Sequence, residues 1–260
     1  MAWRIVMGYV IFFLGSPLTN AQQAPVAFAN LNVTEVEGPA KEAPSIVVGF
    51  VGGFVRHDDM VHSGVQLASR LHAEYGPRLY VQVFENRRRE EAHQDILKAL
   101  DTEHRGALSD EQKRNARIII YGMSWGGSET VELARELEKD KIPVLLAITV
   151  DSVAKPGQNN RLIPANVAEA ANFYQTGGLL HGEPEIQAAD PSRTKILGNF
   201  RYEYDDKNVP CENYPWWDRY LVRQHTEIEC DPAVWNRVDS LIRSKLPPPV
   251  QASAAHGEKH

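Results

Sequence analysis

The sequence predicts an α/β fold with a mostly parallel central sheet and helices on both faces. Short, continuously apolar runs alternate along the chain with longer amphipathic segments. Continuous apolar runs are typical of strands buried on both faces, and amphipathic segments between them suit helices that cover a parallel sheet. The chain has 260 residues, of which 43% are hydrophobic and 24% charged. This composition is that of a globular protein with a core of ordinary size.

Strand and helix patterns alternate from residue 45 onward. The predicted strands are dense in aliphatic residues, whereas the predicted helices repeat apolar residues every three or four positions. A last helix is predicted to open at Asp231-Pro232, because Asp is a favoured N-cap and Pro fits the first helical position. The predicted strands are 45–51, 78–84, 117–121, 142–150 and 195–202, and the helices before the last one are 60–72, 88–100 and 128–139.

The two ends of the chain differ in composition from the region between them. Residues 1–21 combine a positively charged start, an apolar stretch and small residues, which is the order of a secretory signal peptide. A membrane span needs about 20 apolar residues, and the apolar stretch is shorter than this. An uncleaved membrane anchor is the alternative interpretation. Residues 22–43 are interpreted as a linker or leading strand, residues 44–246 as the α/β domain, and residues 247–260 as a disordered tail.

The net charge and the cysteine content limit the classes of partner and the cellular compartments that the sequence suits. The net charge of −6 argues against nucleic acid as the main partner, because phosphate binding needs a basic surface. The chain has two cysteines, Cys211 and Cys230, and no CxxC pair, so no zinc site is indicated. In an oxidising compartment these two cysteines can form a disulfide, which for a loop of about 20 residues stabilises by about 3 kcal/mol. Two unpaired thiols are the alternative.

The segment Gly122-Met123-Ser124-Trp125-Gly126 matches the G-x-S-x-G motif. An apolar strand is predicted before it and an amphipathic helix after it, which is the context that the motif requires. The serine of such a tight turn is exposed above the sheet, and the glycines avoid collisions across the turn. The start of the helix adds positive partial charge where an oxyanion forms. An inert serine in a glycine-rich turn is the alternative.

On this motif and its setting, residues 45–246 resemble the α/β-hydrolase superfamily in its lipase, esterase and thioesterase branch. The resemblance is one of architecture and motif order and does not extend to a specific enzyme. It implies an oxyanion hole, in which one donor is the backbone amide of Trp125, the residue after the nucleophile. The second donor is expected in the loop Gly49–Phe54, where Phe50 aligns with the superfamily's donor and Val51 is the alternative.

The superfamily order places the histidine after the serine and the acid. His225 lies shortly before the predicted last helix, which is where the superfamily's histidine stands. We therefore expect His225 to act as the general base toward Ser124. His181 is the rival, but it precedes the last predicted strand and is early for this role.

Two sites compete for the acid. Asp151 ends the apolar strand that follows the nucleophile helix, whereas Asp205 and Asp206 follow the last predicted strand. We favour Asp151, because a carboxylate at the carboxyl end of a central strand lies beside the crevice where such sheets bind ligands. Asp205 and Asp206 stand in a charged segment that is typical of a solvated turn.

These residues predict an exported serine hydrolase that cleaves carboxylic esters, or thioesters, through an acyl-serine intermediate. No metal or organic cofactor is implied, and the expected partner is a small-molecule ester or a lipid. Secretion, or export to the periplasm, favours an ester or lipid over a cytosolic acyl-CoA. Phe54, Leu179, Leu180 and the pair Trp216-Trp217 are candidates for contacts with an acyl chain. The alternatives are a catalytically inactive relative that binds a ligand or protein, and a peptidase on the same fold.

Overall fold

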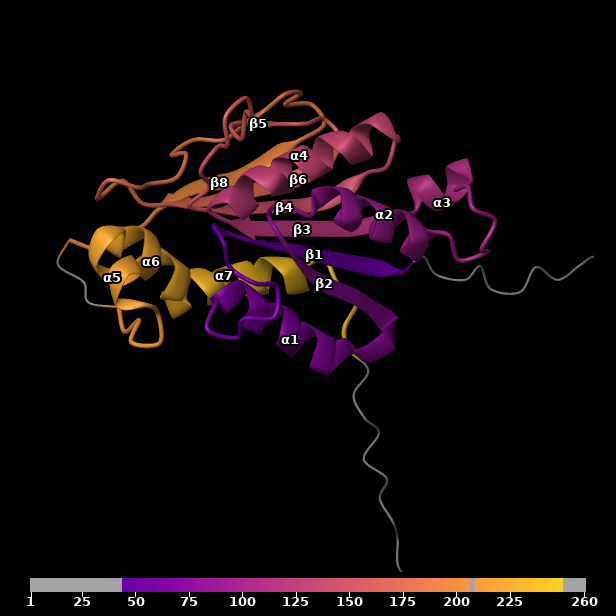
Figure 1. The fold of residues 1–260 in the computed structure, drawn as a ribbon. Coiled ribbons are helices and arrows are strands. Elements are labelled where there is room, and N and C mark those ends of the chain that lie inside the picture. Colours follow the sequence, from indigo (N-terminus) through magenta and orange to yellow (C-terminus); the bar gives the residue numbers. More distant parts are fainter. Residues whose placement is uncertain (1–43, 206–208, 250–260) are drawn as a thin grey trace, which may run out of the picture. The chain divides into compact units, whose positions relative to one another are not determined.

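One six-stranded parallel sheet organises the structure (Figure 1). The computed structural model describes residues 44–205 and 209–249. The strand order is β2-β1-β3-β4-β6-β8, and every neighbouring pair in it is parallel. The predicted fold class is therefore confirmed. The strands are β1 (Ser45–Val51), β2 (Leu79–Glu85), β3 (Arg117–Met123), β4 (Val144–Val150), β6 (Val167–Tyr174) and β8 (Lys195–Arg201), and a separate pair is formed by β5 (Leu162–Ile163) and β7 (Gln187–Ala188).

The helices cover the sheet and its carboxyl end. The last predicted helix begins as expected, because the Asp231 side chain accepts a hydrogen bond of 2.8 Å from the Ala233 amide and Pro232 occupies the first turn. The sequence did not predict the short helices η1, α3, α5 and α6. The helices are α1 (Ser63–Tyr75), η1 (Gly76–Arg78), α2 (Arg89–Leu100), α3 (Asp110–Arg114), α4 (Trp125–Lys139), α5 (Trp216–Leu221), α6 (Arg223–Cys230) and α7 (Pro232–Arg243).

Each face of the sheet has its own hydrophobic core. Consecutive strand residues point to opposite faces, so Val47 packs in the core that contains Leu71 of α1 and Val238 of α7. The next residue, Val48, packs in the core that contains Ala134 of α4. Figure 1 shows the same division, with α2 and α4 on one side of the sheet and α1 and α7 on the other.

The strand order changes direction at β1 and β3. The chain runs outward from β1 to β2, returns to the other side of β1 as β3, and continues to β4. Crossovers between parallel strands are right-handed, so this reversal places α1 on one face and α2 and α4 on the other. The carboxyl ends of strands at such a reversal border the crevice where open α/β sheets bind ligands. Gly52 follows β1 there, and Ser124 follows β3.

Strand β6 was not predicted from the sequence. Its first half, Val-Ala-Glu-Ala-Ala, is rich in residues that favour helices. In the structure the strand lies between β4 and β8, where Ala170, Ala171 and Phe173 are completely buried. Strand formation depends on packing against neighbouring strands more than on intrinsic preference. Strand β6 ends at Tyr174, and Gln175 is the first residue beyond it.

Several predictions concern residues at the margins of the structure. The predicted signal peptide (1–21), the segment 22–43 and residues 250–260 of the predicted tail lie outside the described residues, as does Asp206. Residues 247–249 form neither helix nor strand. Within the described ranges, none of the helices combines the length and the apolar character that a membrane crossing needs.

Candidate active site

Ser124 lies on a tight turn between β3 and α4. Its backbone has φ 56° and ψ −124°, a conformation that costs a non-glycine residue on the order of 1–3 kcal/mol. The glycines of the motif permit the turn, as the sequence predicted. A Cβ atom on Gly122 would lie 2.2 Å from the Gly126 carbonyl oxygen, and one on Gly126 would lie 2.3 Å from the Phe50 carbonyl oxygen. The backbone around the serine is therefore packed too closely for any side chain at these two positions.

The start of α4 faces the serine with its amide groups. Trp125 is the first residue of this helix, and the first amides of a helix have no partner within it. The Ser124 amide instead donates to the Val150 carbonyl at 2.9 Å, which ties the turn to the end of β4. The helix start thus places positive partial charge beside the Ser124 hydroxyl.

Asp151 follows β4 and is completely buried. Its Oδ2 lies 2.6 Å from Nδ1 of His225, a residue 74 positions later in the chain. An ionised carboxylate only accepts hydrogen bonds, so Nδ1 of His225 carries the proton and Nε2 is the acceptor of a neutral imidazole. This is the tautomer that a general base needs. The backbones of the two strand ends are also joined, because the Val153 amide donates to the Ser124 carbonyl at 3.1 Å.

His225 lies in the first turn of α6, a helix that the sequence did not predict, and it precedes the last helix as expected. It is 8% exposed. Its helix is tied to α5, because the Thr226 hydroxyl donates to the Asp218 carbonyl at 3.1 Å. Within the described residues, the Ser124 hydroxyl makes no hydrogen bond to His225. The structure therefore joins Asp151 to His225 directly, and it ties the backbone of Ser124 to Val150 and Val153, which lie on either side of Asp151 in the chain.

The rival residues lie elsewhere. Asp205 is exposed, and its Oδ1 accepts a hydrogen bond of 2.7 Å from the Gln224 side chain. His181 is exposed, with its Nδ1 3.3 Å from the Gly182 carbonyl oxygen. Among the described residues, neither side chain is hydrogen-bonded to Asp151 or His225. Across residues 44–205 and 209–249, the structure gathers no group of three His, Cys, Asp or Glu side chains that would suit a metal ion.

The loop after β1 approaches the serine from the other side. Phe50 lies inside β1, where it is paired with both neighbouring strands and is 2% exposed. Gly52 comes closer to the nucleophile, since a Cβ atom on it would lie 2.8 Å from the Cβ of Ser124 and 3.5 Å from its Oγ. The part of the loop that contacts Ser124 therefore begins one residue beyond the strand.

Two side chains that the sequence analysis missed hold this loop. Asn86 donates to the Gly53 carbonyl at 2.5 Å, and Glu85 Oε1 contacts the His57 amide at 3.3 Å and its Nδ1 at 2.9 Å. Burial opposes ionisation of Glu85, but the hydrogen bonds from the His57 side chain and from backbone amides outweigh it and lower the pKa of Glu85 to about 2. Both residues stand at the carboxyl end of β2. That position in the sequence, directly after a predicted strand, is the signal that could have identified them as residues near the site.

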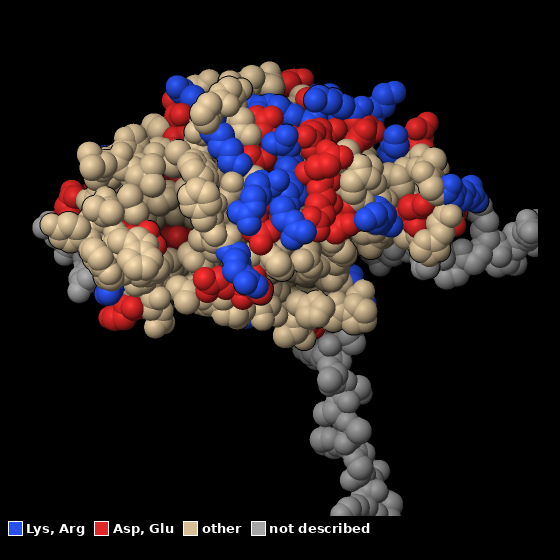
Figure 2. All heavy atoms as spheres, in the orientation of Figure 1, with Lys and Arg blue, Asp and Glu red and all other residues tan. Residues whose placement is uncertain are grey.

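Exposed apolar side chains gather beside the site. Figure 2 shows Lys, Arg, Asp and Glu concentrated over α2 and α4, whereas the end that carries α5 and α6 is mostly free of them. Phe54 is 87% exposed and packs edge-on against Trp125, with 6.0 Å between the ring centroids. Leu179, in the loop after β6, is 96% exposed. The exposed hydrophobic residues of α5 are Trp216, Trp217, Tyr220 and Leu221.

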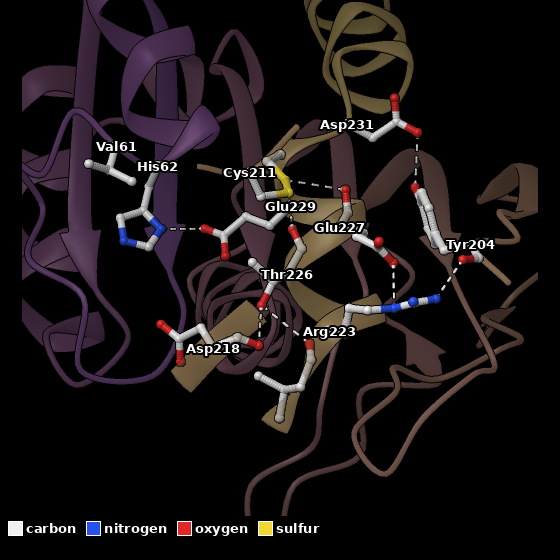
Figure 3. The surroundings of a disulfide bond; sticks show 12 residues. Val61, His62, Tyr204, Cys211, Asp218, Arg223, Thr226, Glu227, Glu229 and Asp231 are labelled. Carbon is white, nitrogen blue, oxygen red and sulfur yellow. Dashed lines mark hydrogen bonds and ion pairs between the residues drawn. A yellow bond between two sulfur atoms is a disulfide. The ribbon is translucent and has the colours of Figure 1, made fainter. Parts of the chain in front are cut away.

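A disulfide and a buried ion pair anchor α6 (Figure 3). Cys211 and Cys230 are bonded, with 5.9 Å between their Cα atoms, so the two cysteines of the chain pair. One residue before the second cysteine, Glu229 Oε1 lies 2.5 Å from Nδ1 of His62. Burial disfavours a charged His62, but the hydrogen bond and the charge of Glu229 prevail and raise the pKa of His62 above 6.5.

The order of these parts along the sheet is distinctive. The turn at Ser124 follows β3, the buried Asp151 follows the adjacent β4, and His225 precedes the last helix. The sheet is parallel and has helices on both faces. This is the α/β-hydrolase fold.

Comparisons with solved structures find similarity at a low level. No protein-family model and no curated protein sequence matches the chain. Human thioesterase 2 is 11% identical, with a TM-score of 0.35 over 78% of this chain and 96% of that chain. A dienelactone hydrolase-like promiscuous phosphotriesterase from metagenomic libraries is 15% identical, with a TM-score of 0.37 over 80% of this chain and 89% of that chain. Arabidopsis thaliana SOBER1 is 10% identical, with a TM-score of 0.34 over 79% of this chain and 100% of that chain. Likenesses of this size assign neither a substrate nor a mechanism.

Proposed function

We propose that the chain is a serine hydrolase that cleaves carboxylic esters through an acyl-serine intermediate. Ser124 is the nucleophile, His225 the general base and Asp151 the acid. The observation that carries this proposal is the 2.6 Å contact between Asp151 and His225, beside a serine held in a positive-φ turn at a helix start. A module that only binds a ligand needs neither a buried acid–histidine pair nor a strained serine.

The proposed reaction has two halves. In the first, Nε2 of His225 accepts the proton of Ser124 as Oγ attacks the ester carbonyl, and then returns it to the leaving alcohol oxygen. In the second, His225 takes a proton from water as the water attacks the acyl-serine, and then returns this proton to Oγ of Ser124 as the carboxylic acid leaves. Asp151 holds the imidazole in the required tautomer and stabilises the imidazolium that forms in each half.

The oxyanion needs amide donors on the side opposite the acid. The Trp125 amide at the start of α4 is the first. For the second, the sequence analysis favoured Phe50, with Val51 as the alternative. The place of both residues within β1, and the approach of Gly52 to Ser124, favour an amide of the Gly52-Gly53 segment instead. The expected donor therefore moves to the first residues beyond the strand.

The surroundings of the site support an ester with an apolar acyl group. Phe54 packs edge-on against Trp125, directly beside the proposed nucleophile, and leaves most of its ring in solvent. A small-molecule ester or a lipid is the substrate class that suits such a surface. The disulfide is compatible with secretion or a periplasmic location, since disulfides persist in oxidising compartments. Export would leave a mature chain that begins at Gln22, which N-terminal sequencing of the exported protein tests.

Labelling with a fluorophosphonate probe tests the mechanism. The folded wild type is expected to label, whereas Ser124→Ala and His225→Ala are not. His181→Ala is the matched control, because it removes an exposed imidazole outside the proposed triad, and it is expected to label as the wild type does. A folded wild type that stays unlabelled would overturn the proposal in favour of a binding module. A panel of esters and peptide amides then separates an esterase from a peptidase.

A further inference from the structure

Gln175 is the first residue after β6, the strand next to the one that carries Asp151. It is 1% exposed. Its Nε2 donates to Oδ2 of Asp151 at 2.8 Å and to the Leu180 carbonyl at 2.9 Å, and its Oε1 accepts the Gly177 amide at 2.7 Å. Both groups that face Nε2 only accept hydrogen bonds, so the orientation of the side-chain amide is determined. Gln175 thus bonds the very oxygen that faces His225.

The loop that begins at Gln175 closes on Asp151 at its other end. The Gly182 amide donates to Oδ1 of Asp151 at 2.8 Å, and the Gln175 amide donates to the same oxygen at 3.2 Å. A Cβ atom on Gly182 would lie 2.3 Å from the Asp151 carbonyl carbon, so the two backbones are in direct contact. The Glu183 amide also donates to the Ser152 carbonyl at 2.8 Å. Residues 175–183 therefore form a clamp around the acid.

We propose that Gln175 is a positioning residue, which fixes the rotation of the Asp151 carboxylate so that Oδ2 faces Nδ1 of His225. The torsion that turns a carboxylate about its Cβ–Cγ bond is broad and weakly restricted. Two backbone amides hold Oδ1, and among the described residues Oδ2 is bonded by His225 and by the Gln175 side chain. Gln175 is thus the donor on Oδ2 that does not belong to the histidine, and without it the rotation of the carboxylate would rest on the two amides at Oδ1 and on His225.

The kinetic consequence of this proposal rests on the proposed function, but the geometric claim does not. A group that only closed the loop would leave the Asp151–His225 hydrogen bond as it is. A positioning residue changes that bond when it is removed. The proton on Nδ1 of His225 reports the difference directly, because its NMR resonance depends on the hydrogen bond to the carboxylate.

The experiment compares Gln175→Leu with Gln158→Leu. Gln158 is a matched control, since its Nε2 also donates to a buried carboxylate, Glu129 Oε1, at 2.9 Å, and it does not touch Asp151. We expect a far-downfield Nδ1 proton in the wild type and in Gln158→Leu. In Gln175→Leu we expect that resonance to shift upfield or to be lost through exchange with water. A resonance that is the same in all three proteins would overturn the proposal.

Kinetics provide a second measure on the same proteins. With an ester substrate, Gln175→Leu is expected to lower kcat by on the order of 10-fold to 100-fold, the cost of misplacing a catalytic group, with KM unchanged. In an Asp151→Asn background the same change should add nothing, because both act through one carboxylate. Additive losses would contradict a role through Asp151. If the wild type cleaves no ester, the proposed function fails, and the NMR comparison still decides the role of Gln175.

A second variant covers the case in which Gln175→Leu does not fold. Gln175→Met keeps the length of the side chain but removes the donor to Asp151. The thioether sulfur has no proton to donate, so the 2.8 Å hydrogen bond to Oδ2 is lost. We expect the His225 proton resonance to move in this variant too. An unmoved resonance and an unchanged kcat would overturn the proposal.

Discussion

The two loops that flank Ser124 are held in different ways. On one side, the clamp 175–183 bonds a proposed catalytic side chain itself, the carboxylate of Asp151. On the other side, Asn86 and Glu85 bond only the backbone and the His57 side chain of the loop after β1. The first set of contacts therefore controls the orientation of a charge, and the second controls the place of a backbone amide.

This difference determines how well substitutions on each side of Ser124 should be tolerated. A carboxylate serves the histidine only in one orientation and one protonation state, so the loss of one contact changes the chemistry. A backbone amide remains when a neighbouring side chain is changed, and such a change only displaces it. The acid side also depends on α6, which carries His225 and is anchored by the disulfide and by His62. We expect substitutions there to have the larger effects.

The largest effect is expected from Asp151→Asn. An amide in this place favours the wrong tautomer of His225, so kcat should fall by about 1,000-fold to 10,000-fold while the fold is kept. Asp205→Asn is the control, because that carboxylate is exposed and contacts Gln224 instead. Steady-state kinetics on an ester decide between them. The reverse pattern, with Asp205→Asn inactive, would assign the acid to the later segment.

The second largest effect is expected from removal of the disulfide, which should lower the free energy of unfolding. The bond joins residues 19 apart in the sequence, and a loop of this length contributes about 3 kcal/mol by restricting the unfolded chain. The double variant Cys211→Ala, Cys230→Ala is therefore expected to unfold at a lower urea concentration. Wild type treated with a reductant should behave in the same way. An unchanged midpoint in both would show that α6 does not depend on this bond.

On the opposite side, Asn86→Ala tests the loop after β1. Loss of the 2.5 Å bond to the Gly53 carbonyl lets the Gly52-Gly53 segment move away from Ser124, so we expect kcat to fall by on the order of 10-fold. Asn159→Ala, at an exposed loop position, is the control and should keep the wild-type rate. A loss as large as that of Asp151→Asn would erase the contrast between the two sides.

The smallest effect is the pH dependence of stability that His62 confers. Its pKa is raised above 6.5 in the folded state, so its contribution is fully present below pH 6.5 and is lost as the pH rises through the raised pKa. Glu229, Asp59 and Asp218 face it. The wild type should therefore exceed His62→Gln in Tm more at pH 6 than at pH 9. We expect a difference on the order of 1 kcal/mol, which is about 2–4 °C.

Thermal melts of both proteins at the two pH values measure this difference. Glu229→Gln should show the same trend, because it removes the charge that raises the pKa of His62. An advantage of the wild type that grew with pH would mean that neutral His62 is the stabilising form. The ion pair would then not anchor α6.

Local sequence patterns predicted much of the fold and the position of the turn at Ser124. The turn at Ser124 is encoded within a few residues, since an apolar strand, closely placed glycines and an amphipathic helix leave little choice of backbone. The buried strands were equally predictable from the sequence where they are rich in Val, Ile and Leu, as in β1, β3 and β4. Strand β6 was missed because its Ala and Glu residues favour a helix, and only its place between two strands makes it extended.

Contacts between distant residues required the folded chain. The sequence offered Asp151, Asp205 and Asp206 as acids and His225 and His181 as bases, but a hydrogen bond across 74 residues depends on how β4 and α6 meet. The same holds for Gln175, which matters only because β6 lies beside β4, and for Asn86, which matters only because β2 lies beside β1. Short-range sterics determine a turn, whereas the partners of a buried charge are chosen by the packing of elements far apart in the chain.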